Sequence, residues 1–136
     1  NECCEIKTPP RRYRCPVNGR EYRAVGIKTM LHHLLRPWKK TLSSQAYYFC
    51  TDPACDVVYF GRDDSVINRD EVRTTVGIKE ALPDSMLCYC FGISYSEAAE
   101  NSKLKSFVKK QTGQSLCSCE TSNPSGRCCL KDFPEH

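Results

Sequence analysis

Residues 46–60 read Ala-Tyr-Tyr-Phe-Cys-Thr-Asp-Pro-Ala-Cys-Asp-Val-Val-Tyr-Phe. Two runs rich in aromatic and β-branched residues flank a short segment that begins at Cys50, ends at Cys55 and contains Asp-Pro. Runs of this composition on either side of a turn predict a β-hairpin. The hairpin would carry two cysteines in one turn, from which both thiols can supply ligands to one metal ion.

Short elements are expected on both sides of this hairpin. Residues 21–25 and 65–68 have strand composition, and 71–76 is expected to add further strand. Apolar residues at helical spacing predict an amphipathic helix over 27–35. Pro37 would stop this helix, because proline cannot continue one. Together these elements predict a small α/β unit.

The chain changes character around Pro83-Asp84-Ser85, and we place a domain boundary between residues 84 and 85. Ser94 and Glu97 have the spacing of a capping box, which predicts a helix over 95–101. A second helix would follow Ser102 and end at Gly113, a natural C-terminal stop. The predicted fold class is therefore α+β, with an α/β unit in residues 1–84 and a mainly helical unit in 85–136. Residues 8–12 are expected to form an extended loop.

Eleven cysteines among 136 residues dominate the composition, and they fall into one group before residue 60 and another after residue 87. An odd number argues against a pure disulfide framework, and the close spacings suit metal ligation and a reducing cytoplasm. No run of 18 apolar residues exists, so we expect no membrane insertion. The net charge of +4 is too mild to favour nucleic acid as a partner.

The first cysteine group has the residue types of a structural zinc site, which takes four soft ligands in a tetrahedron. The hairpin supplies two thiols, and Cys15-Pro-Val-Asn-Gly resembles half of a zinc knuckle in which Asn18 replaces the second cysteine. A ligand from the N-terminal end would fill the remaining place; Cys4 is preferred and Cys3 is the substitute. The predicted zinc ligands are Cys4, Cys15, Cys50 and Cys55.

Two histidines, His32 and His33, lie on the helix expected over 27–35 but are less favoured as ligands. A site closed by four thiolates has no open coordination position. We therefore expect this zinc to stabilise the small unit rather than to catalyse a reaction.

The second cysteine group suits a 2Fe–2S cluster, which four thiolates hold, two on each iron. One pair, Cys88-Tyr-Cys90, lies just before the expected helices, and two thiolates one residue apart can bind the same iron. Two further pairs follow the helices, so six thiols compete for four places. Zinc is the rival metal, because spacing alone separates the two chemistries poorly. The later candidates are Cys117, Cys119, Cys128 and Cys129.

Several strings resemble the N-terminal domain of CopZ-type copper chaperones across nearly the whole chain. They include Cys3-Cys4, the turn that begins at Cys15, Phe49-Cys50-x4-Cys55-Asp-Val-Val-Tyr-Phe, Cys88-Tyr-Cys-Phe-Gly, and Cys119-Glu-x3-Pro-Ser-Gly-Arg-Cys-Cys-Leu. The C-terminal half also resembles bacterioferritin-associated ferredoxin, a helical 2Fe–2S module.

The family pattern favours Cys119 over Cys117, because Glu120 and the Asn-Pro-Ser-Gly loop follow it directly. Adjacent residues in an extended segment point to opposite sides, so one of the last two cysteines should face the iron, and we prefer the second. The predicted fold is thus a zinc-stabilised α/β unit followed by a helical 2Fe–2S-binding unit. The predicted cluster ligands are Cys88, Cys90, Cys119 and Cys129.

The resemblance implies a metal-binding redox domain that supports intracellular copper trafficking and reduces Cu²⁺ to Cu⁺, with copper as the transported ion. Delivery to a copper-transporting P-type ATPase would belong to the family's heavy-metal domain, whose Met-x-Cys-x-x-Cys site is absent from these residues. The alternatives are a non-redox zinc module for protein interaction and a stand-alone electron-transfer ferredoxin; the electron donor is not identified. Such a domain is closer to a metallochaperone than to an enzyme.

Overall fold

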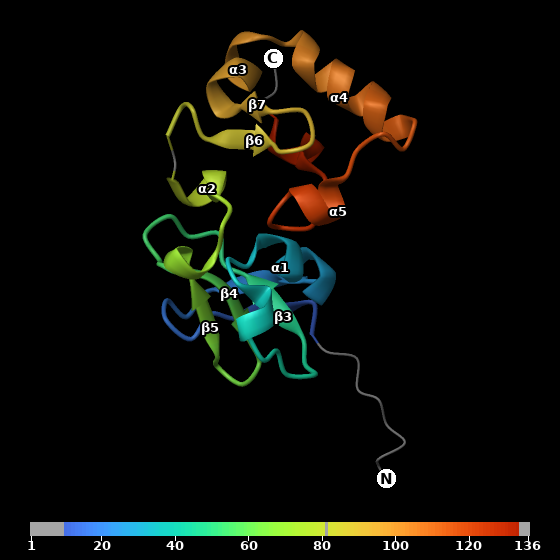
Figure 1. The fold of residues 1–136 in the computed structure, drawn as a ribbon. Coiled ribbons are helices and arrows are strands. Elements are labelled where there is room, and N and C mark those ends of the chain that lie inside the picture. Colours follow the sequence, from blue (N-terminus) through green and yellow to red (C-terminus); the bar gives the residue numbers. More distant parts are fainter. Residues whose placement is uncertain (1–9, 81, 134–136) are drawn as a thin grey trace.

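The computed structural model describes residues 10–80 and 82–133. The predicted hairpin is confirmed: β3 (Tyr47–Phe49) and β4 (Val57–Gly61) pair antiparallel, with Tyr48 opposite Phe60. Every residue of both strands is buried. These two strands lie inside a five-stranded sheet and therefore form its centre (Figure 1).

The other strands are β1 (Arg12–Arg14), β2 (Glu21–Val25) and β5 (Val66–Asn68). The sheet has the order β1-β2-β3-β4-β5, and each neighbouring pair is antiparallel. The strand β1, at one edge, was not expected, because 8–12 was predicted to be a loop. The ring of Tyr13 in this strand stacks on Tyr48 at 5.4 Å between centroids, which holds the short edge strand against the sheet.

The expectation of a strand over 71–76 was wrong. A 3₁₀ turn, η3 (Arg69–Glu71), ends where that strand should begin, and Asn68 caps the start of this turn through a capping box with Glu71. Beyond it, Val72 forms an isolated antiparallel bridge with Leu34. The valines of this segment, Val72 and Val76, therefore pack in the core without forming a strand of the sheet.

The helix α1 (Ile27–His33) covers the sheet and ends two residues earlier than expected. Leu34 is extended because it pairs with Val72, and a separate 3₁₀ turn, η2 (Pro37–Lys39), begins at the proline. The sheet and this helix share a core made of Val25, Met30, Leu34, Tyr47, Phe49, Val58, Tyr59, Ile67, Val72 and Val76.

The C-terminal half contains the two expected helices and an unexpected two-stranded sheet, β6–β7. The Ser94 capping box is confirmed, with Glu97 N–H donating to the serine hydroxyl at 3.2 Å. The elements are α2 (Gly77–Glu80), β6 (Met86–Cys88), β7 (Ile93–Ser94), α3 (Tyr95–Glu100), α4 (Lys103–Gly113), α5 (Cys119–Ser122) and η4 (Cys129–Asp132). None of the described helices is long and apolar enough to cross a lipid bilayer.

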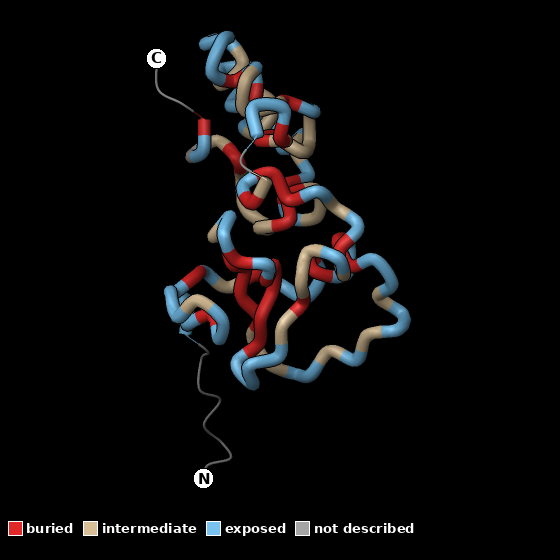
Figure 2. The backbone as a smooth tube through the Cα atoms, turned by 90° about the vertical axis from the view of Figure 1, so that its left-hand side faces the viewer, coloured by how far each residue is buried: buried red, intermediate tan, exposed pale blue. Residues whose placement is uncertain are grey.

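Two lobes result, which we call the sheet lobe (residues 10–76) and the helical lobe (86–133). Figure 2 shows buried backbone gathered separately in each. They meet where α1 packs against α5, and the Thr29 hydroxyl donates to the Glu120 carbonyl at 2.5 Å. The buried Tyr59 hydroxyl donates to the Pro124 carbonyl at 2.6 Å. Buried hydrogen bonds of this kind set how the lobes are placed.

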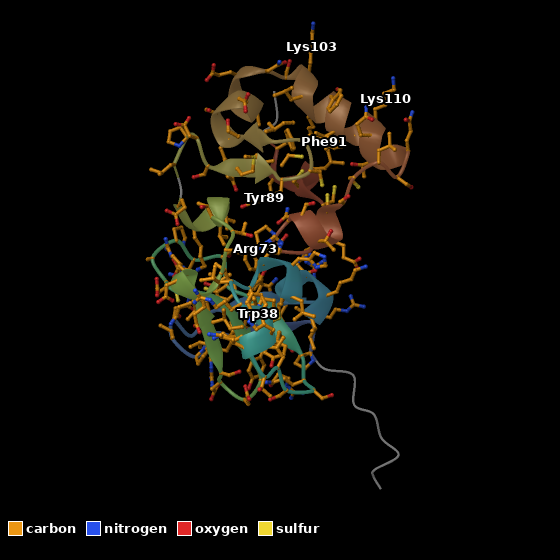
Figure 3. The ribbon with its side chains drawn as sticks, viewed as in Figure 1. Trp38, Arg73, Tyr89, Phe91, Lys103 and Lys110 are labelled. Atoms are coloured by element: carbon orange, nitrogen blue, oxygen red, sulfur yellow. The ribbon has the colours of Figure 1, made fainter. Side chains whose placement is uncertain are left out.

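A second contact between the lobes runs through α2. The hydroxyl of Tyr89 accepts a hydrogen bond from the Gly77 N–H at 2.7 Å, and Figure 3 shows this tyrosine between the lobes. A Cβ on Gly77 would lie 2.1 Å from the Met86 carbonyl oxygen. Only glycine allows α2 to approach β6 so closely.

Candidate metal centres

Three cysteines of the sheet lobe converge on one point. The Sγ atoms of Cys15, Cys50 and Cys55 all lie within 4.8 Å of one another. The first two residues are 0% exposed and the third 5%. Thiolates around one tetrahedral zinc lie about 3.8 Å apart, given Zn–S bonds of about 2.3 Å. The three sulfurs are therefore close enough to bind one ion with small adjustments.

Local backbone structure brings these thiols together. Cys15 follows β1 and starts a turn in which Gly19 N–H donates to its carbonyl at 2.9 Å. Gly19 has φ +76°, a conformation that glycine adopts without strain. Cys50 follows β3 and its N–H donates to the Val58 carbonyl at 2.9 Å, so the hairpin ladder holds the start of the cysteine turn.

Asn18 occupies the place where a zinc knuckle would have its second cysteine. Its amide Nδ2 lies 3.4 Å from Cys50 Sγ and 3.1 Å from the Tyr22 hydroxyl. An amide cannot replace a thiolate as a zinc ligand of this type, but its N–H can donate to one. Asn18 therefore stabilises negative charge on sulfur from outside the ligand set.

Lys79 was missed by the sequence reasoning. It is 2% exposed, and its Nζ donates to the Asp52 and Cys55 carbonyls at 2.8 and 2.9 Å and reaches Cys50 Sγ at 3.5 Å. A buried ammonium is costly unless negative charge lies beside it. No local signal pointed to this lysine, because it follows Cys55 by 24 residues and comes from α2.

The fourth predicted zinc ligand, Cys4, and its substitute Cys3 lie outside the described residues. The two histidines of α1 hold other partners: His32 Nδ1 is 2.8 Å from the Lys28 carbonyl, and His33 Nδ1 is 2.5 Å from the Thr74 hydroxyl. Burial lowers the pKa of His33. Neither belongs to the three-thiol group found among residues 10–80 and 82–133.

The helical lobe brings four cysteines together in two pairs. Cys90 Sγ lies 3.6 Å from Cys119 Sγ, at the first residue of α5. Cys88, at the end of β6, accepts a hydrogen bond from Cys129, at the first residue of η4, and this bond lowers the pKa of the Cys88 thiol to about 6. Both Cys88 and Cys90 therefore have a cysteine neighbour in the C-terminal segment.

The two competing thiols, Cys117 and Cys128, are more exposed than their rivals Cys119 and Cys129. Cys119 is 9% exposed and Cys129 is 1% exposed. Cys117 and Cys128 are only half-buried. The Ser118 N–H donates to Cys90 Sγ at 3.1 Å. The backbone between Cys117 and Cys119 therefore contacts the sulfur of Cys90.

Known proteins resemble the parts of this chain that contain the two cysteine groups. A family described as "Zinc binding domain" (zf_CopZ) matches residues 12–73, which include the three converging thiols. The curated "Copper chaperone CopZ" of Archaeoglobus fulgidus is 32% identical over 120 residues, or 85% of this chain and 57% of that protein. The chain thus spans little more than half of that relative.

A solved structure extends the similarity to both lobes. The X-ray structure of the Archaeoglobus fulgidus CopZ N-terminal domain aligns with a TM-score of 0.68 at 31% identity. The alignment covers 90% of this chain and 100% of that domain. A match of this extent cannot be limited to the zinc-binding residues, because residues 12–73 are under half of the chain.

Proposed function

This chain belongs to the family of CopZ N-terminal domains, and we propose that it binds one zinc ion and one 2Fe–2S cluster in support of copper handling. The observation that carries the proposal is that two thiol groups differ in geometry. One gathers three sulfurs within 4.8 Å, and the other separates into two pairs. One metal ion suits the first arrangement, and a centre with two metals suits the second.

The zinc ligands that we propose are Cys15, Cys50 and Cys55, with Cys4 as the fourth and Cys3 as its substitute. The described donors fit a thiolate site, because Asn18 and the buried Lys79 both direct hydrogens at Cys50. Zinc here would stabilise the sheet lobe. A closed set of four thiolates leaves no place for a substrate.

The cluster ligands that we propose are Cys88, Cys90, Cys119 and Cys129. The sulfur separation of 3.6 Å between Cys90 and Cys119 is close to the value of about 3.8 Å that a tetrahedral metal with bonds of about 2.3 Å requires. Each iron would then take one thiolate from residues 88–90 and one from the C-terminal segment. Such a cluster would supply single electrons, and one electron reduces Cu²⁺ to Cu⁺.

The copper role rests on the similarity to CopZ. Thiolate sites favour Cu⁺ over Cu²⁺, so a chaperone that carries copper on cysteines needs the reduced ion. We propose that the protein acts in the cytoplasm. Copper transfer from it to a copper-transporting P-type ATPase would use a heavy-metal domain that these 136 residues do not contain. We place the boundary between the zinc and cluster units after residue 84.

Metal analysis of the purified chain tests this proposal. We expect one zinc, two irons and two labile sulfides per chain, visible absorption from the oxidised protein, and an EPR signal from an S = 1/2 centre after dithionite reduction. Zinc in both sites, or no iron after anaerobic purification, would contradict the cluster assignment.

Copper reduction is tested separately. The dithionite-reduced chain, freed of excess reductant, should reduce one Cu²⁺ per cluster, which a Cu⁺-specific chromophore measures. The Cys119→Ser variant is the control for reduction by free thiols. Equal Cu⁺ yields from both proteins would contradict a role of the cluster in reduction.

A further inference from the structure

Four arginines line one cleft on the surface of the sheet lobe. The cleft has a cavity volume of about 420 Å³, and its lining consists of Arg11, Arg12, Arg23, Ala24 and Arg127. The first three arginines are exposed, and the fourth is half-buried. These residues play no part in the metal sites described above.

The pairing of β1 with β2 places two of these charges directly opposite each other. Arg12 and Arg23 are Cα partners in the antiparallel ladder. Like charges directly opposite each other in a ladder are destabilising. A partner of opposite charge would therefore stabilise this pair of arginines. The ion pairs found in the described part of the chain involve Lys28, Lys40 and Arg69, and none involves an arginine of the cleft.

The fourth arginine comes from the helical lobe. Arg127 lies in the loop just before the last cysteine pair, and its Nη2 donates to the Ala24 carbonyl at 3.3 Å. The loop is held in place because Gly126, at φ +73°, leaves room for Thr29; a Cβ there would lie 2.8 Å from the threonine hydroxyl. The guanidinium of Arg127 is therefore held beside the arginines of the sheet lobe.

Among residues 10–80 and 82–133, most guanidinium donors of the cleft have no hydrogen-bond partner. Arg12 gives one N–H to the Glu21 carbonyl at 3.0 Å, and Arg127 gives the one already described. A guanidinium has five N–H donors in a planar fork that matches the oxygens of phosphate. A second hollow of about 200 Å³ adjoins the cleft, and Thr51 and Ser125 contribute to its lining.

We propose that this cleft is a binding site for a small anion of the phosphate class that carries at least two charged oxygen groups. Arg12 and Arg23 would hold one group from the sheet lobe, and Arg127 would hold it from the helical lobe. The ligand would offset the repulsion within the ladder and connect the two lobes. The inference does not depend on which metal either thiol group binds.

Calorimetric titration of the purified full chain with inorganic phosphate and with pyrophosphate tests the proposal. Pyrophosphate should bind more tightly, because it can occupy both hollows. In the double variant Arg12→Gln/Arg23→Gln, affinity should fall at least about tenfold, since hydrogen bonds to charged groups are among the strongest in proteins. Saturating pyrophosphate should also raise the melting temperature of the unaltered chain.

The double variant Arg36→Gln/Lys39→Gln is the matched control. It removes the same charge from two exposed residues that do not line the cleft, and should keep the affinity of the unaltered chain within about twofold. Equal weakening in both double variants would show a general charge effect and overturn the site. Binding of a hexaglutamate peptide without binding of pyrophosphate would also overturn it, in favour of a protein docking surface.

Discussion

The two thiol groups of this chain use one residue type in opposite ways. In the sheet lobe, Cys15, Cys50 and Cys55 are held by turns next to strands, and an amide and a buried ammonium direct hydrogens at the sulfur of Cys50. In the helical lobe the sulfurs lie in pairs, and Cys90 stays half-buried. Burial of all three thiols in the sheet lobe suits a metal that only stabilises the fold, whereas the one half-buried thiol among the four paired thiols of the helical lobe, Cys90, suits a centre that exchanges electrons.

The largest expected effect is loss of zinc from the sheet lobe alone. Cys50→Ser removes the thiolate that both supporting donors contact, and we expect zinc to be lost and the sheet lobe to lose several kcal/mol, since structural zinc contributes on the order of 10 kcal/mol in small units. Zinc content and thermal unfolding measure this, with cluster absorption largely unchanged. Full zinc retention would refute the assignment.

The next effect sharpens the choice among the thiols of the helical lobe. Cys119→Ser should strip or badly weaken the cluster, because each iron needs its full thiolate set. The matched variant Cys117→Ser should leave the visible spectrum nearly unchanged. A colourless Cys117 variant together with a brown Cys119 variant would show that the ligand assignment is wrong.

A smaller effect is expected from the buried lysine. Lys79→Met keeps an unbranched side chain as far as Cε but removes the ammonium that donates to two carbonyls and to Cys50. We expect a loss of about 3 kcal/mol from the free energy of unfolding, because buried groups left without partners carry the full desolvation cost. Denaturant unfolding of the zinc-loaded chain measures it. The control is Lys110→Met, at an exposed residue of α4. Equal losses of unfolding free energy in the two variants would contradict a special role for Lys79.

The smallest effect concerns an ion pair, Lys40 with Glu71, that belongs to neither thiol group. Lys40, which donates to Glu71, together with the Asn68 N–H, holds the pKa of Glu71 below its usual range. A lowered carboxyl pKa contributes stability above the unfolded value, which is lost as pH falls through the folded one. Since both partners are about one-third exposed, Glu71→Gln should cost about 1 kcal/mol or less at pH 7.

Acid titration of the unfolding free energy checks this last effect. The difference between the unaltered chain and Glu71→Gln should shrink below about pH 4.5, where the unfolded carboxyl is protonated. A difference that grows as the pH falls would contradict the assignment.

Local sequence determined the parts of the fold that depend on neighbouring residues. The hairpin around Cys50 and Cys55 and the capping box at Ser94 are confirmed, because strand composition, turn residues and N-caps act over a few positions. The strand expected over 71–76 was wrong, since Val72 forms only an isolated bridge with Leu34 and is buried in the core, and no ladder follows it. Zinc and cluster ligation stay predictions.

Tertiary structure decided which residues from distant segments of the chain contact one another. Only the folded chain brings Lys79 to Cys50, pairs Cys90 with Cys119, and gathers arginines of β1, β2 and the 123–127 loop around one cleft. The spacing of cysteines along the chain indicated metal ligation because ligands repeat over short distances. Partners that are 29 residues or more apart carry no such pattern, since packing of the two lobes, not local geometry, sets their separation.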